Sequence, residues 1–187
     1  MGTRQGWPGA AISMMVATSI FVGCRRDPVR VESVEATGPA AVGATASVQT
    51  AASGTFTQTA ITSLDVRTAG PNTTLDQTSA GVITGTLAGT FEDKLKVVIH
   101  PSGKFDAHFT ITCVCTVDGK SGVLEIVAGD TGELLSPTLA AFAGRAVING
   151  GTGALSGLRG VLQIEGTVDV TTGLATYGYA GNIHFAP

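Results

Sequence analysis

The sequence predicts an all-β protein: an antiparallel up-and-down β-barrel of about eight strands, preceded by a signal segment and a flexible tether. Its 187 residues include 26 glycines and only 13% charged residues, and this composition favours short strands and tight turns. Apolar and polar residues alternate over several stretches, which is the period of a half-buried strand. No stretch of the globular part has a competing helical pattern, and hairpin turns separate the strands, so a barrel is favoured over a sandwich.

Residues 1–23 are predicted to be a lipoprotein-type signal peptide, cleaved before Cys24. The run from Ala10 to Val22 is apolar and, at about 13 residues, is shorter than the roughly 20 that span a bilayer. A small residue precedes Cys24, as in bacterial signals whose cysteine becomes lipidated. Phe21 stands where that pattern prefers leucine, so an ordinary secretory signal or an uncleaved anchor is the alternative. We expect an exported protein, anchored in the bacterial cell envelope through Cys24 or secreted.

Residues 24–52 are predicted to be a flexible tether. They contain no aromatic residue and no sustained period, so they bury too little area to offset the cost of ordering. A coil of this length spans roughly 30 Å. A partly ordered strand around residues 29–34 is the alternative.

Residues 53–187 form the predicted barrel domain. The clearest strands, each with one apolar face, are 105–117, 158–170 and 175–185, and weaker ones are placed at 54–61, 77–87, 90–99, 122–128 and 142–149. Asp118-Gly119 predicts a two-residue hairpin turn, because both positions tolerate positive φ. About eight strands enclose a lumen that side chains fill or that holds one small ligand.

Two stretches between these strands are expected to be loops. Residues 62–77 are polar, and residues 130–137 carry Leu134 and Leu135 between turn residues. Such loops either edge the mouth of a barrel or lie on its surface without a role.

The segment from Gly150 to Gly166 is a glycine-rich turn that leads into a strand. It is not a dinucleotide loop, because Gly151 and Gly153 are followed by Ser156 where a third glycine is required, and no helix is expected after it. The net charge of −3 gives no long-range attraction to nucleic acid. We therefore expect no cofactor and no nucleic-acid partner.

The string Gly151-Thr-Gly-Ala-Leu-Ser-Gly-Leu-Arg-Gly160, together with Gly119-Lys-Ser-Gly122, resembles a bacterial family of unknown function in the allene oxide cyclase barrel-like superfamily. The resemblance covers roughly residues 53–187. It implies a β-barrel, often with an apolar lumen, sometimes cyclase activity on hydrophobic substrates, and in some members a homo-oligomer. Many members carry a Gln-His pair in the strand after the Gly-x-Ser-Gly turn. Val127-Ala128 stands there in this chain, so any role of that histidine is absent.

The candidate ligand-binding residues are those expected on the lumen face. Asp93 shares its parity with Leu95 and Val97, which makes it the best candidate for a buried acid with a raised pKa, although we expect a bulge to turn it outward. A tyrosine hydroxyl in the lumen either orients a ligand or pairs with the backbone. The full set is Phe91, Asp93, Phe109, Cys113, Cys115, Leu162, Tyr177 and Tyr179.

Cys113 and Cys115 are expected to be small core residues. Two residues apart in a strand, they lie on one face about 6.8 Å apart, so a bridge between them needs a local bulge. A metal or redox site is the other alternative, but His108 lies on the opposite face of the strand, so we expect no metal site.

The expected function is that of a non-enzymatic protein that binds a small hydrophobic ligand in its lumen. The first alternative is a cyclase or isomerase acting on a hydrophobic substrate, and the second is a structural or assembly protein. A lumen packed solid by its aromatic side chains would exclude a ligand. An open lumen with an acid or tyrosine cluster would favour an enzyme.

Overall fold

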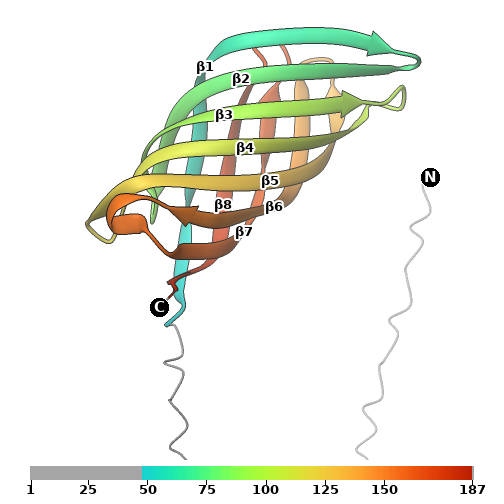
Figure 1. Ribbon diagram of the computed structural model, residues 1–187. Helices are drawn as coiled ribbons and strands as arrows, with labels where there is room; N and C mark the ends of the chain where they lie inside the picture. The colour runs from blue at the N-terminus through green and yellow to red at the C-terminus, as the bar shows by residue number, and fades with distance from the viewer. Residues whose placement is uncertain (1–47, 187) are drawn as a thin grey trace, which may run out of the picture. The chain divides into compact units, whose positions relative to one another are not determined.

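The computed structural model describes residues 48–186, and these form a closed barrel of eight antiparallel strands (Figure 1). Each strand pairs with the next in sequence, and the last pairs with the first. The predicted fold class is confirmed. The strands are β1 (Thr50–Ala69), β2 (Asn72–Gly85), β3 (Ala88–Ile99), β4 (Lys104–Val117), β5 (Lys120–Ser136), β6 (Leu139–Gly151), β7 (Leu158–Asp169) and β8 (Leu174–Phe185).

Within residues 48–186 the single helix is the short 3₁₀ turn η1 (Gly153–Leu155), which joins β6 to β7. In this part of the chain we find no helix of the length and apolarity needed to cross a membrane. The predicted signal peptide, Cys24 and the tether up to residue 47 lie outside the described residues.

Both predicted loops are wrong, because strands run through them. β1 and β2 continue as a long hairpin up to the turn at Gly70, and cross-strand pairs hold it along its whole length. Arg67 forms exposed ion pairs with Asp65 and Asp76 on this hairpin. β5 continues to Ser136, since the glycines of its second half pair with β4 and β6 and do not turn.

The structure also shows where β1 begins and how β4 turns into β5. β1 begins at Thr50, inside the stretch expected to be a tether, because Ala52 is buried and pairs with Gly181 of β8. The predicted hairpin turn between β4 and β5 is confirmed, with positive φ at both Asp118 (48°) and Gly119 (75°).

Aromatic rings that lie beside glycines occupy much of the lumen. Inward-facing glycines pair in register with aromatic residues of the neighbouring strand. A Cβ atom at Gly81 would lie 2.6 Å from the ring of Phe91, and one at Gly54 would lie 2.5 Å from the Tyr179 hydroxyl. Each ring therefore occupies the space that a side chain would take if the paired glycine were any other residue. The pairs are Gly54–Tyr179, Gly81–Phe91, Gly132–Phe105 and Gly166–Tyr177.

The rings gather around Phe56 in the middle of the lumen. Phe56 stacks on Tyr177 with ring centroids 4.9 Å apart, and Phe91 and Tyr179 meet it edge-on at 5.3 and 5.4 Å. Phe142 packs edge-on against Tyr177 at 5.6 Å. This cluster separates a closed end of the lumen from an open end.

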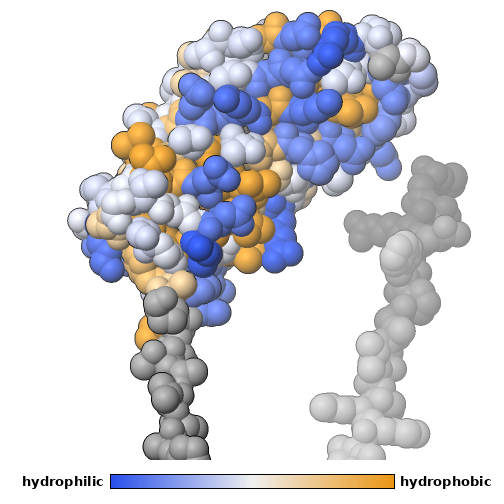
Figure 2. Space-filling model, viewed as in Figure 1, coloured by the Kyte–Doolittle hydropathy of each residue, from blue (hydrophilic) through white to orange (hydrophobic). Residues whose placement is uncertain are grey.

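The end beside η1 is closed. Leu87, Val117, Leu124, Leu155 and Leu158 are fully excluded from solvent there. The opposite end, formed by the turns that join β1 to β2, β3 to β4, β5 to β6 and β7 to β8, is the mouth. Large apolar side chains remain exposed around it. Over the visible outer face of the barrel, apolar patches lie scattered among hydrophilic ones (Figure 2). The exposed apolar residues of this rim are Leu134, Leu135, Leu139 and Val170.

Cys113 and Cys115 lie in the core near the closed end and form a disulfide. The expected core position is confirmed, and the disulfide that the sequence left as an alternative is present. No bulge is needed, since the pairing of β4 is regular on both sides. The two Cα atoms lie only 5.4 Å apart, less than the roughly 6.8 Å between such residues in an extended strand. Both register neighbours of Cys115 are glycines, Gly89 and Gly122, so no side chain on a neighbouring strand opposes this contraction.

Replacing Gly166 by alanine should lower the free energy of unfolding by about 1–3 kcal/mol, the range for an overpacked core. The added Cβ would collide with Tyr177 and with the backbone of Thr176. Gly178→Ala is the matched control, because nothing lies nearer than 3.9 Å to its added Cβ. Urea unfolding of both variants measures the difference, and equal stabilities would contradict the proposed packing.

Candidate functional site

A cavity of about 60 Å³ lies inside the lumen between the aromatic cluster and the mouth. Solvent reaches its walls, since Phe105, Phe109 and Phe142 are 7–9% exposed whereas the closed end is at 0%. The volume suits a ligand head group or a few waters and is well below that of a typical drug-sized site. Four polar side chains join its apolar walls: Gln58, Asp93, Asp130 and Tyr177.

Asp93 points inward and is fully hydrogen-bonded. Gln58 Nε2 donates to its Oδ2 at 2.8 Å, and both the backbone N–H and the hydroxyl of Ser79 donate to its Oδ1. The expected bulge is absent, because β3 pairs regularly with β2 and β4 through this position. Burial raises the pKa of Asp93, although the hydrogen bonds from Ser79 and Gln58 oppose the shift.

This network also closes a seam in the barrel wall. β1 and β8 pair as far as Thr57 and Thr176, after which β1 is bulged. Beyond that pair, the Gln58 side chain accepts a hydrogen bond of 2.8 Å from the backbone N–H of Ala175. Asp93 therefore orients Gln58, and its role is structural.

Asp130 is the buried acid that is not fully hydrogen-bonded. It is buried on β5, and its Oδ1 atom has no hydrogen-bond partner. Its register neighbours are Ala107 and Gly144, neither of which carries a polar side chain. Burial raises the pKa of Asp130 to about 7, so the carboxyl exchanges its proton near neutral pH.

Tyr177 faces the same cavity and its hydroxyl also lacks a partner. Burial raises the pKa of Tyr177 well above its usual value, and the carboxyls of Asp93 and Asp130 raise it further. Tyr179 differs, because its hydroxyl accepts from the backbone N–H of Leu87 at 2.8 Å and donates to the carbonyl of Thr84 at 3.1 Å. Tyr177 is thus available to a ligand and Tyr179 is not.

All eight predicted site residues are buried, but only Asp93, Phe109 and Tyr177 line the cavity. Phe91 packs on Phe56, and the remaining predicted residues lie outside the cavity lining. Asp130 was missed because Gly129-Asp130-Thr131-Gly132 looks like a turn, although Asp130 shares its parity with Ile126 and Ala128. Gln58 was missed although it shares the face of Phe56 within a predicted strand.

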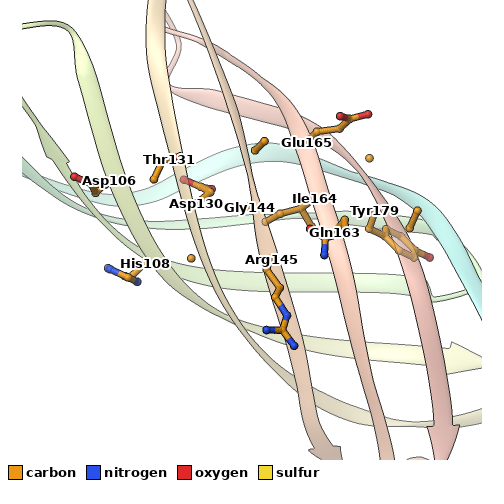
Figure 3. A pocket seen from close by; sticks show the side chains of 14 residues that line it. Asp106, His108, Asp130, Thr131, Gly144, Arg145, Gln163, Ile164, Glu165 and Tyr179 are labelled. Carbon is orange, nitrogen blue, oxygen red and sulfur yellow. The ribbon is translucent and has the colours of Figure 1, made fainter.

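A second, larger hollow of about 900 Å³ lies on the outer wall over β4 to β8. In Figure 3, Asp106 and His108 lie on one side of Asp130, and Arg145, Gln163 and Glu165 on the other. Its floor is made of small residues, namely Gly129, Ala143, Gly178 and Ala180. Apart from Asp130, which reaches both hollows, it contains no buried polar atom without a partner, so the lumen cavity is the better candidate.

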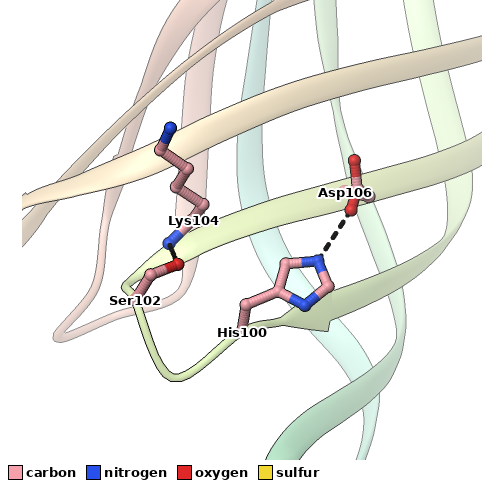
Figure 4. A network of polar contacts seen from close by, with 4 residues as sticks. All are labelled: His100, Ser102, Lys104 and Asp106. Carbon is pink, nitrogen blue, oxygen red and sulfur yellow. Dashed lines mark hydrogen bonds and ion pairs between the residues drawn. The ribbon is translucent and has the colours of Figure 1, made fainter.

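The turn between β3 and β4 borders the mouth and is held by polar contacts (Figure 4). His100 Nε2 lies 2.8 Å from Asp106 Oδ2, and the Lys104 backbone N–H donates to the Ser102 hydroxyl at 3.4 Å. The backbone N–H of Leu134 donates to the carbonyl of Gly103 at 2.9 Å. The first two contacts shape the turn, and the third fastens it to the end of β5, which fixes one side of the entrance.

Among the described residues, no group of three or more His, Cys, Asp or Glu side chains is placed to hold a metal ion. The cavity instead offers an unpaired carboxyl oxygen and an unpaired hydroxyl within apolar walls. Such an arrangement can bind the polar head of a small molecule and exchange a proton with it.

The fold and this cavity define a small closed β-barrel with one open mouth. The barrel is similar to the crystal structure of a protein of unknown function from the DUF3224 family of Shewanella oneidensis MR-1, with a TM-score of 0.53 and 16% sequence identity. The similarity covers 75% of this chain and 99% of that one, and at this identity it shows the fold alone. Comparison of the sequence with protein-family profiles and with curated proteins gives no match.

The raised pKa of Asp130 predicts a pH-dependent stability. The folded protein keeps the Asp130 proton up to about pH 7, whereas the unfolded chain releases it near its ordinary value of 3.8. Between these values the folded state binds more protons, so this group's contribution to stability falls as the pH rises. Wild type should therefore lose stability relative to Asp130→Asn from about pH 4 to about pH 7.

Thermal unfolding across this pH range measures the effect. Glu165→Gln, on the exposed outer face of β7, is the control and should show no such trend. A constant difference between wild type and Asp130→Asn would contradict the raised pKa.

Proposed function

We propose that this chain is an exported, lipid-anchored binding protein that holds a small ligand in the mouth of its barrel. One observation carries the proposal: two polar groups that line the cavity, Asp130 Oδ1 and the Tyr177 hydroxyl, are buried without partners. Buried polar groups are nearly always paired, and leaving one unpaired costs about 1–3 kcal/mol. A ligand whose head group bonds to both would remove that cost.

The surroundings of the cavity support a ligand with an apolar part. The walls are formed mainly by aromatic and aliphatic side chains, and Leu134, Leu135, Leu139 and Val170 expose apolar surface around the mouth. The cavity of about 60 Å³ takes a head group, while the rest of the ligand lies against this rim. The outer end of the ligand then stays close to solvent.

We also propose that the barrel belongs to the allene oxide cyclase barrel-like superfamily. The closed eight-strand barrel and the turn from Gly151 to Gly160 between β6 and β7 support this. The proposed attachment to the membrane rests on the sequence before Cys24 alone.

A cyclase or isomerase acting on a hydrophobic substrate is the second candidate. The carboxyl of Asp130, with a pKa raised to about 7, is suited to general acid–base catalysis, and Tyr177 lines the same cavity. The fully bonded Asp93 has no part in such chemistry. An apolar substrate altered on incubation with wild type, but not with Asp130→Asn, would favour this candidate over simple binding.

The anchor is tested by mass spectrometry of the protein purified from its own membrane fraction. We expect a mature chain that begins at a lipid-modified Cys24, and a Cys24→Ser variant that carries no lipid. An unmodified Cys24 still joined to residues 1–23 would overturn this part of the proposal.

The ligand site is tested by filling it. Ala107 is buried and lines the cavity, so Ala107→Leu should weaken the binding of 1-hexanol about tenfold or more, as expected when a contact worth about 1.4 kcal/mol is lost. Ala143→Leu, on the exposed outer face of β6, is the control and should bind as wild type does. Titration calorimetry of the full chain gives the affinities, and equal binding by both variants would exclude the cavity.

A further inference from the structure

The charged side chains buried inside the barrel are all acidic. Among residues 48–186, two acidic side chains are buried, Asp93 and Asp130. No lysine, arginine or histidine of these residues is buried. His108 and Arg145 follow the two register neighbours of Asp130 in sequence, but both face the outer hollow. The lumen therefore provides negative charge with no basic group to neutralise it.

The two acids differ in what remains open to a ligand. The three hydrogen bonds from Gln58 and Ser79 occupy Asp93, whereas Asp130 Oδ1 has no donor at all. The Tyr177 hydroxyl, also unpartnered, lines the same cavity. A group that donates hydrogen bonds and carries positive charge would bond to both oxygens and compensate the buried carboxylate.

The walls fit the same kind of group. The rings of Phe105, Phe109, Phe142 and Tyr177 line the cavity, and aromatic faces attract organic cations. The cavity of about 60 Å³ is large enough for an ammonium head and its first carbons. An anionic ligand, in contrast, would meet two carboxyls and no base.

We propose that the ligand of this barrel is an organic monocation, an alkylammonium whose head binds between Asp130 and Tyr177 and whose apolar chain leaves through the mouth. This inference rests on the proposed function, since it names the class of ligand held by the same cavity. The Asp130 carboxylate accepts a hydrogen bond from the ammonium, and the Tyr177 hydroxyl accepts a second. Leu134, Leu135 and the other rim residues contact the chain.

Binding of such a ligand depends on the charge of Asp130. The other titratable groups that face the lumen near it are Asp93 on β3 and Tyr177 on β8. The adjacent strands β4 and β6 present Ala107 and Gly144 on the inside. On the outside of the same wall they carry Asp106, His108 and Arg145. With its pKa near 7, Asp130 is ionised at about pH 8 and neutral at about pH 5, while an alkylammonium stays charged at both.

The test compares hexylammonium with 1-hexanol, which matches it in length but is neutral, by titration calorimetry of the full chain. At about pH 8 wild type should bind hexylammonium at least about tenfold more tightly, the range expected for a charge-assisted hydrogen bond. Asp130→Asn should lose this preference, and the exposed control Glu165→Gln should keep it. Lowering the pH of wild type to about 5 should also remove the preference, which tests the proposal even if Asp130→Asn does not fold.

The outcomes separate the two proposals. Equal binding of hexanol and hexylammonium to wild type, or a preference that survives in Asp130→Asn and at low pH, would overturn the ligand class and leave the lumen binding site standing. Binding of neither probe would overturn both the ligand class and the proposed function.

Discussion

The whole structure depends on pairing glycines with four of the large rings inside the barrel. A lumen bounded by eight strands has little space, yet this chain places the rings of Phe91, Phe105, Tyr177 and Tyr179 in it. The rings fit because glycines on adjacent strands leave the space that their own side chains would take. The same glycines permit the coiling that closes the sheet. The positions of these glycines in the sequence therefore determine both how the rings pack and how the sheet curves.

That packing is uneven, and the unevenness creates the candidate site. The aliphatic residues beside η1 fill one end completely, whereas the rings of the other end leave a cavity around Asp130 and Tyr177. The two buried acids then take different parts. Asp93, bonded to Gln58 and Ser79, supports the wall, while Asp130 has an oxygen left without a donor.

The strands were predictable wherever one face is apolar and the other polar. Residues 105–117, 158–170 and 175–185 lie close to β4, β7 and β8. The prediction failed where strands continue beyond the core, as in β1 and β2, since exposed residues there show no alternation. It failed again at Asp130, because glycines that make room for a ring are indistinguishable in sequence from glycines of a turn. Which acid is free depends on partners from distant strands, such as Gln58 and Ser79, that no local pattern reveals.

The seam between β1 and β8 sets an order on folding. Seven of the eight strand pairs join neighbours in sequence, but this seam unites the first strand with the last. Its contacts have the greatest sequence separation in the barrel, and such contacts cost the most chain entropy and form slowly. Until β8 is present, both edges of the sheet are unpaired and open to other chains. The residues that complete the barrel are therefore also those that end its exposure to aggregation, and the bond from Ala175 to Gln58 is among the last that can form.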